Sequence, residues 1–524
     1  MKCQLLTGLL GLAFLNSFAQ NTTHITQSGS SLTGVITQVG ALNSGVISQT
    51  GTSNVSSIAD IYQQGTSHQA TINQNNGSTF NRGAITQTGV GPGGNWASLS
   101  QSDGSGGSAA RGQVRTMVVT ADAGNWAGAW QLGSSNSSTV SQDGSGTKGN
   151  FGESWQQGSY NITNITQSGA VNGLAEIFQG NDTRPTDYNE GVTVLNVTNN
   201  SASITQNMGS QENQAKIKQL TDDNIASILQ INNSSINTAY IQQGELGALT
   251  TVLGHNNAQI TQAWTSNGNS ASAIQTGMYG LVTITQFDNA ANNIALINQM
   301  SGNYSRAGIQ QSTSASSNTA TVSQWGNGQE ATVNHTNFSA GNQVSIQQGS
   351  SVMPSSNSNR AIIDQQYSTG GKVSINQNTT ETGGSNFAGI YQGTTAVTAN
   401  NLAQVDQQGS SNQTTLFQTS TSGTGSNIAS IGQYGDHNLI GGPGPVGYGL
   451  QDGTANSMIV NQNSPLNSLM AGQNRGYLGQ TGTGNSLTLD QTVTAGTPEG
   501  NSSYIIQTGS FNSATVTQVN GVTP

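Results

Sequence analysis

The sequence predicts an all-β fold, a β-solenoid (curlin-like β-helix) built from stacked coils of strand, turn and strand. Short segments place apolar and amide residues on alternate positions, which is the two-residue period of a β-strand. One spaced frame recurs along nearly the whole chain, as in repeat architectures. Of the 524 residues, only 32% are hydrophobic and 6% charged. That composition disfavours both one large globular core and a charge-driven disordered chain.

The last repeat, Asn501 to Gln518, shows the frame in full. It reads Asn-x5-Gln-x-Gly-x2-Asn-x-Ala-x3-Gln. The alternating positions of its two predicted strands are Asn501, Ser503, Ile505 and Gln507, followed by Asn512, Ala514, Val516 and Gln518. Gly509 stands between the two halves, where a residue without Cβ lets the backbone turn. Each unit is therefore expected to be strand, turn and strand.

The recurring amide residues are predicted to align as ladders along the solenoid axis, because a low charge with many Asn and Gln favours such ladders. The ladder positions singled out in three repeats are Asn125, Gln131, Asn136, Gln142, Asn150, Gln156, Asn161, Gln167, Asn501, Gln507, Asn512 and Gln518. Steps of 11 residues between glutamines, as from Gln27 to Gln38, alternate with longer arcs, such as the 14 residues from Gln142 to Gln156. One coil thus has a tight turn and a loose turn.

This frame, with Ser or Asn at its first position, resembles the repeat of the curlin family, the subunits of curli amyloid fibres on bacterial surfaces. The resemblance runs in short pieces from about Thr22 to Gln518. Asn mostly replaces the first Ser, Ala is often Ser, Thr, Gly or Val, and the chain is several times longer than an ordinary curlin subunit.

The resemblance implies a structural, non-enzymatic protein that assembles into or decorates extracellular amyloid-like fibres, for surface adhesion and biofilm matrix. Its implied partners are further copies of itself or other curlin-like subunits, and an outer-membrane export machinery. The implied location is the secreted, extracellular one of cell-surface fibres.

Residues 1–19 are interpreted as a secretory signal peptide. They combine Lys2 with an apolar run from Leu5 to Phe18 and a small residue, Ala19, before Gln20. The only cysteine, Cys3, lies inside this segment, so the exported chain is expected to contain no disulfide. No later segment is apolar enough to predict a membrane span.

Residues 20–524 are predicted to form one continuous repeat region. Three irregular excursions interrupt it, at 102–120, 181–199 and 436–449. A strand is predicted at Val114 to Thr120 in the first and at Val192 to Val197 in the second, while the Gly/Pro-rich third is interpreted as a loop. The repeats resume at Asn125, Asn200 and Gln451.

No catalytic residue, cofactor site or metal site is predicted. The five histidines stand far apart, and His68 and His335 occupy frame positions usually held by Asn or Gln. Asp-Gly pairs, as at Asp143 and Asp452, are typical of turns, and the Gly-Gly-x-Gly-x-Asp repeat of calcium β-rolls is missing. The net charge of -10 is thinly spread and gives no basic footprint for nucleic acid.

Aromatic residues recur at matching frame positions and are predicted to stack on the outer face. They are Trp96, Trp126, Trp130, Phe151 and Trp155. One interpretation is that the rings cover and stiffen the sheet. The other is that they bind a glycan, a surface or a second filament.

Two functions other than that of a fibre component are also known for β-solenoids, and each requires a particular residue pattern. A β-helix that binds carbohydrate or degrades polysaccharide needs Asp, Arg or Lys clustered at one level, which the low charge disfavours. An ice-binding solenoid needs a uniform Thr row, whereas outward triplets such as Trp126, Gly128 and Trp130 vary. The frame begins at His24 to Gln27 and runs through Gln518 without an evident capping segment. That pattern predicts head-to-tail polymerisation.

Overall fold

The computed structural model describes residues 20–520 except for short internal segments. Those outside the description are 52–55, 76–79, 90–92, 103–124, 145–146, 181–196, 245–253, 301, 350–357, 379–384, 394–397, 420–425, 442–448, 465–472 and 495–499. The expected signal peptide at 1–19 and the expected strand at Val114 to Thr120 lie outside the described residues, as does most of the strand expected at Val192 to Val197.

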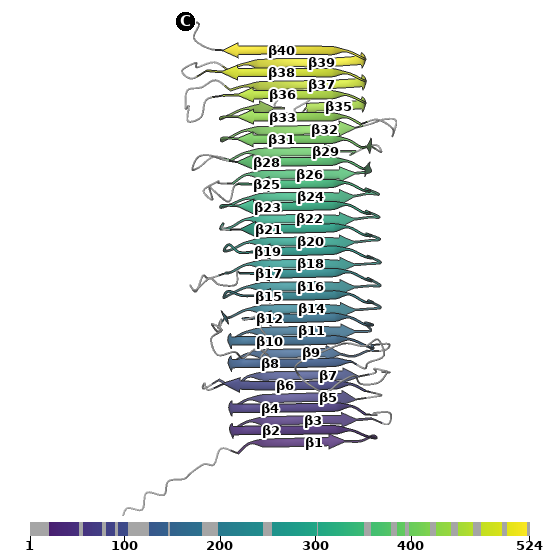
Figure 1. Cartoon of the computed structure of the whole chain (residues 1–524), viewed down its shortest axis with the longest axis vertical. Coiled ribbons are helices and arrows are strands. Elements are labelled where there is room, and N and C mark those ends of the chain that lie inside the picture. Colours follow the sequence, from purple (N-terminus) through teal and green to yellow (C-terminus); the bar gives the residue numbers. More distant parts are fainter. Residues whose placement is uncertain are drawn as a thin grey trace, which may run out of the picture.

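Two 19-stranded parallel β-sheets lie face to face and run the length of the molecule. The chain alternates between them, and the strands of the two sheets point in opposite directions (Figure 1). Each strand pairs with the strand one coil further along, as β1 with β3 and β2 with β4. Among the described residues there is no helix. The predicted β-solenoid is confirmed.

The first sheet contains β1 (Thr22–Gln27), β3 (Ser44–Thr50), β5 (Gln69–Asn75), β7 (Trp96–Ser102), β9 (Ser137–Gln142), β11 (Ile162–Ser168), β14 (Ser201–Asn207), β16 (Ile225–Ile231), β18 (Asn257–Ala263), β20 (Leu281–Phe287), β22 (Arg306–Ser312), β24 (Glu330–Thr336), β26 (Arg360–Gln366), β29 (Phe387–Gln392), β32 (Gln413–Thr419), β34 (Leu439–Ile440), β35 (Gly449–Thr454), β37 (Arg475–Thr483) and β39 (Ser502–Ser510).

The second sheet contains β2 (Thr33–Ala41), β4 (Ile58–Thr66), β6 (Arg82–Gly89), β8 (Trp126–Ser134), β10 (Phe151–Ser159), β12 (Leu174–Gln179), β13 (Val197–Thr198), β15 (Gln214–Gln219), β17 (Thr238–Gln243), β19 (Ser270–Gln275), β21 (Ile294–Met300), β23 (Thr319–Trp325), β25 (Gln343–Gln348), β28 (Lys372–Asn378), β31 (Leu402–Gln408), β33 (Ile428–Tyr434), β36 (Ser457–Asn463), β38 (Ser486–Val493) and β40 (Ser513–Asn520). A two-stranded corner sheet pairs β27 (Ser368–Thr369) with β30 (Thr398–Ala399).

The core is a thin layer of small and medium apolar side chains between the two sheets. In β16, Ala226, Ile228 and Gln230 point inward and are buried. Ile225, the first residue of the strand, points outward and is 53% exposed. Strand pairing keeps the buried positions in line, so Ile228 lies between Ile204 and Ile260 of the neighbouring coils. The alternation read from the sequence is therefore what separates core from surface.

Segments of different length between the strands leave the register intact. Gln101 pairs with Gln142 across the first excursion, and Gln179 pairs with Gln219 across the second. At the end of the second excursion, Val197 and Thr198 form β13 and pair with Gly158 and Ser159 of β10. The described strands on either side of each excursion therefore keep one common register.

The third expected excursion is narrower than the interval 436–449. Leu439 and Ile440 form β34, which pairs with the start of β32, and Gly449 already belongs to β35, which pairs with the end of the same strand. The described strands β34 and β35 therefore pair with the same strand and belong to one repeat. The reason is local: Leu439 and Ile440 follow the corner residue Asn438, as the frame requires.

Candidate functional site

Two rows of buried glutamines connect the coils, one row on each sheet. Along the first sheet, Gln206 donates from Nε2 to Oε1 of Gln230 (2.8 Å), which donates in the same way to Gln262 (2.8 Å). The same Nε2 of Gln230 also donates to the backbone carbonyls of Gln214 (3.1 Å) and Asn237 (3.2 Å). The glutamine rows therefore link each coil to the next and also link the two sheets.

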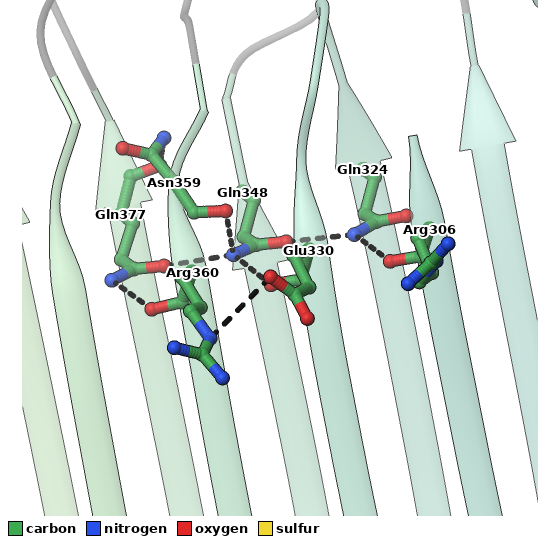
Figure 2. A network of polar contacts seen from close by, with 7 residues as sticks. All are labelled: Arg306, Gln324, Glu330, Gln348, Asn359, Arg360 and Gln377. Atoms are coloured by element: carbon green, nitrogen blue, oxygen red, sulfur yellow. Dashed lines mark hydrogen bonds and ion pairs between the residues drawn. The ribbon is translucent and has the colours of Figure 1, made fainter. Parts of the chain in front are cut away.

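Figure 2 shows the same pattern on the second sheet, where Gln324, Gln348 and Gln377 follow one another. Gln324 donates to Gln348 (2.8 Å), and Gln348 donates to Gln377 (2.9 Å). Each glutamine also reaches a carbonyl of the facing sheet, such as that of Glu330 for Gln348 (2.9 Å). On the outside, the Arg360 guanidinium lies 3.4 Å from the Glu330 carboxylate.

The glutamines selected from the sequence all lie in these rows. Gln142 donates to Gln167 (2.8 Å) in the first sheet, and Gln131 donates to Gln156 (2.7 Å) in the second. In the last repeat, Gln507 accepts from Gln480 (2.9 Å) and Gln518 accepts from Gln491 (2.7 Å). Every donor in this series points towards the C-terminal end of the solenoid.

Asparagines form a second kind of row at the corners. The backbone N–H of Asn150 donates to Oδ1 of Asn125 (3.1 Å), and that of Asn161 donates to Oδ1 of Asn136 (3.1 Å). Asn136 also donates from Nδ2 to the carbonyl of Gly158 in the next coil (2.9 Å). Asn512 continues the row by donating to Asn485 (3.0 Å), and Asn501 donates to Asn474 (3.0 Å). Most of these buried amides are tolerated because they are hydrogen-bonded, although Nδ2 of Asn125 is buried without a partner among the described residues.

Two histidines replace amides in these rows, as their frame positions predicted. His68 stands in an Asn row: its N–H donates to Oδ1 of Asn43 (3.1 Å), and its Nδ1 accepts from the N–H of Asn95 (3.1 Å). His335 stands in a Gln row, with Nδ1 3.3 Å from Nε2 of Gln311. Burial lowers the pKa of His68 and lowers the pKa of His335 to about 4, so both rings are neutral at neutral pH.

The predicted aromatic stack exists on the outer face of the second sheet. Trp126 stacks on Phe151 and Trp130 on Trp155, each with ring centroids 4.5 Å apart. Phe178, which sequence reasoning missed, extends the second column, with its centroid 6.5 Å from that of Trp155. Although these positions face away from the core, Phe151 is only 4% and Trp130 only 7% exposed. The rings do not form an open platform.

Trp96 does not belong to this stack. It starts β7 of the first sheet, where it pairs with Gln69 and Ser137 and is 41% exposed. The expectation failed because Asn95 and Asn125 begin strands of opposite sheets, half a coil apart. Asn125 and Asn150 are a full coil apart, which brings Trp126 and Phe151 together.

The aromatic rings lie over a glycine. A Cβ on Gly128 would come within 2.4 Å of ring atoms of both Trp126 and Trp130. The pattern recurs in the first sheet, where Gly389 lies beneath Phe387 and Tyr391. Large aromatic residues beside a strand glycine compensate for the missing side chain. An aromatic-x-Gly-x-aromatic spacing in the sequence could have revealed both places.

The core beneath this stack is unusually small. Ala127 and Ala129 are the inward residues of β8, and in the next coil Ser154 shares a hydrogen bond with Thr163 across the core (2.6 Å). In these coils the large side chains are on the outer face of the sheet, whereas most other coils have a large apolar side chain in the core. This arrangement supports the interpretation that the rings cover and stiffen the sheet.

The two ends of the described solenoid present complementary hydrogen-bonding groups. In the first coil, Oε1 of Gln38 is buried and has no partner. In the last coil, Gln507 and Gln518 donate only to the carbonyls of Ser486 (3.0 Å) and Ser502 (3.2 Å), with no further glutamine to receive them. The first coil thus leaves one buried glutamine acceptor without a partner, and the last coil leaves two glutamine amides without a glutamine acceptor.

The chain matches no known protein family model, and a search of curated proteins finds no significant match. Within the described ranges, no group of three or more His, Cys, Asp or Glu side chains is placed to hold a metal ion. The described part of the chain also contains no helix that is long and apolar enough to cross a membrane.

Proposed function

We propose that this protein is a secreted structural component of extracellular amyloid-like fibres, similar in role to curlin subunits, and that it serves surface adhesion and biofilm matrix. The observation that carries the proposal is the complementarity of the two end faces. An unpartnered row of backbone and amide groups at the edge of a sheet is a template for another β-strand.

The proposed contact places β39 over β1 and β40 over β2 of the next copy. Gln507 then donates to Gln27, and Gln518 donates to Oε1 of Gln38, which removes a buried unpartnered acceptor. Both joined strands have the same side-chain alternation, so the contact continues the existing ladders. Because the two faces differ, the contact is heterologous and does not close on itself, which yields filaments.

Exposure of the terminal coils agrees with this contact. All six residues of β1 are exposed, including Ile25 at 43%. At the other end, Tyr504 and Ile506 are 62% and 53% exposed. A further coil at either end would bury part of this apolar surface, a favourable contribution of about 25 cal/mol per Å².

The test is electron microscopy and amyloid-dye binding of the purified chain without residues 1–19. The expected result is unbranched filaments with a diffraction spacing of about 4.7 to 4.8 Å, whose growth is accelerated by preformed fragments. Deletion of residues 501–524 removes β39 and β40, so β37 and β38 become the terminal strands. This change should alter the rate of filament growth. A chain that stays a monodisperse monomer with and without fragments contradicts the proposal.

A further inference from the structure

The two outer faces of the solenoid differ in charge. The nine consecutive strands of the first sheet from β3 to β20 contain no Asp, Glu, Lys, Arg or His. Over the same coils the second sheet carries Asp60, Arg82, Glu153, Glu176, Lys216 and Lys218. A partner that packs against these nine strands of the first sheet therefore buries none of their charged side chains, whereas a partner on the second sheet would have to desolvate several.

An alternating row of side chains runs along one margin of that uncharged face. The first outward position of its strands holds a large apolar residue in every second coil: Trp96, Ile162, Ile225 and Leu281. Between them, in register, stand Ser137, Ser201 and Asn257. We call these seven residues the apolar ridge.

The large residues of the ridge project into solvent. Trp96 is 41%, Ile162 52% and Ile225 53% exposed. Since strands lie about 4.8 Å apart, the large side chains recur about every 9.6 Å, with a notch of similar width between them. Several other outward positions, such as Ser98, Ser203 and Ser227, are small, whereas Leu229, Ile231 and Phe287 add further large apolar side chains to the face.

We propose that the uncharged face of the first sheet binds a second copy of this chain, side by side and antiparallel. A two-fold axis along the strand direction brings ridge against ridge and reverses its order. With a shift of one coil, three of the four large residues of each copy then face the three notches of the other. Such an interface is self-complementary, as a two-fold interface must be.

The size of the face suits a stable pair. Nine strands about 4.8 Å apart and about seven residues long give a geometric footprint of about 900 Å², close to the ~800 Å² per partner of a standard interface. This pairing is lateral, and it does not depend on the proposed end-to-end contact.

The test separates lateral from axial association by using chains that carry Gln518→Glu, which places a carboxylate on the donor face. Sedimentation velocity of this chain should reveal a species of twice the chain mass. Adding Ile162→Ser and Ile225→Ser should weaken the pair by at least about tenfold in Kd. The matched control is Ile294→Ser with Ile428→Ser, which are 49% and 43% exposed at the same strand position of the second sheet.

Filament width provides a second measurement. Wild-type filaments should appear as pairs, and those of the Ile162→Ser, Ile225→Ser chain as single filaments, with unchanged thermal unfolding. Filling a notch with Ser201→Trp should likewise separate the pairs. The proposal is overturned if no pair forms in either assay, or if the control substitutions weaken it as much as the ridge substitutions. Filaments that are single but still elongate would contradict the lateral pair and leave the end-to-end contact standing.

Discussion

At the scale of single residues, the inward side chain decides whether a coil can exist. Ile284 is fully buried in β20, whereas its neighbour Thr283 points outward and is only partly covered. A charge at this inward position would be buried among apolar side chains, without water or a counter-ion. A charge at the outward position stays hydrated.

Ile284→Asp should therefore cost about 4 kcal/mol or more and open the surrounding coils, while Thr283→Asp should cost less than about 1 kcal/mol. Hydrogen exchange of peptides that cover β18 to β22 measures the difference locally, which suits a fold whose coils contact mainly their neighbours. Equal loss of protection in the two variants would contradict the assigned alternation.

His335 makes one coil sensitive to acid. The folded-state pKa of about 4 lies below the ordinary value of 6.5 because burial disfavours the charged ring. Its contribution to stability is therefore present above pH 6.5 and is lost as the pH falls towards 4. The loss is on the order of 3 kcal/mol.

His335→Gln restores the glutamine row and should remove this pH dependence. The measurement is hydrogen exchange around β24 at pH 7 and pH 4 in both chains. Asp364 nearby also has a raised pKa through burial, but it is present in both chains and cancels in the comparison. If the two chains respond alike to acid, His335 is not the sensitive group.

At the scale of the strand and its turn, glycine permits the close stacking of the corners. Gly133 has φ of +117°, and a Cβ there would lie 2.0 Å from the carbonyl oxygen of Gly158 in the next coil. Gly308, in the middle of β22, has no such constraint: the nearest atom to a Cβ would be 3.9 Å away. The two glycines therefore have different reasons to be present.

Gly133→Ala should destabilise its coil by about 3 kcal/mol, because both the backbone conformation and the contact with Gly158 disfavour a side chain. Gly308→Ala should be neutral or stabilising by up to about 1 kcal/mol, since the unfolded chain loses conformational freedom. Thermal unfolding monitored by circular dichroism checks both. Similar losses in the two variants would mean that strand geometry, not the corner contact, requires glycine.

The outer aromatic columns also act at this scale. Trp130 stacks on Trp155, covers Gly128 and is 7% exposed, whereas Trp264 lies at a corner and is 55% exposed. Trp130→Ala should cost about 3 to 5 kcal/mol, and Trp264→Ala about 1 kcal/mol or less. Urea unfolding followed by the remaining tryptophan fluorescence measures both. A Trp130→Ala chain of wild-type stability would instead favour a binding role for the rings.

At the scale of the whole molecule, the sequence predicts the solenoid because each element repeats one local rule. Alternation defines the buried positions, and the corner Asn and the row Gln define the coil, as at Asn125 and Gln131 or Asn150 and Gln156. The sequence does not reveal which sheet a strand joins, because turn lengths vary. Trp96 was misplaced for that reason, and the apolar ridge emerges only after Ile162 and Ile225 are assigned to the same sheet.

The third excursion shows the same limit at its boundaries. From linear spacing alone the whole interval 436–449 is interpreted as a loop, although Leu439, Ile440 and Gly449 belong to strands that pair with β32. Pairing with the coils on either side identifies these strands. Long-range register is therefore the information that spacing along the chain cannot supply.

The last prediction follows from the direction of the hydrogen bonds in the glutamine rows, in which each Nε2 donates towards the C-terminal end of the solenoid. Gln518 accepts from Gln491 (2.7 Å) and from the Ser503 hydroxyl (2.7 Å), and its remaining donor capacity faces the end of the solenoid. Gln518→Glu keeps both acceptor functions within the chain. It replaces the outward donor by a carboxylate, which would face Oε1 of Gln38 in the next copy and repel it.

The Gln518→Glu chain loses the donation to the Ser502 carbonyl (3.2 Å), so its last coil should be weakened locally. It should still add to a growing filament through its unaltered first coil, but it should then block the next addition. A small fraction of this chain mixed with wild-type protein is expected to stop elongation, with mean filament length inversely proportional to the fraction added. The control is Thr517→Glu, which adds the same charge one residue away on the outward side. Dye-binding kinetics and filament lengths by electron microscopy distinguish the two. Equal inhibition by both chains would point to general charge repulsion and against end-to-end contact through the glutamine rows.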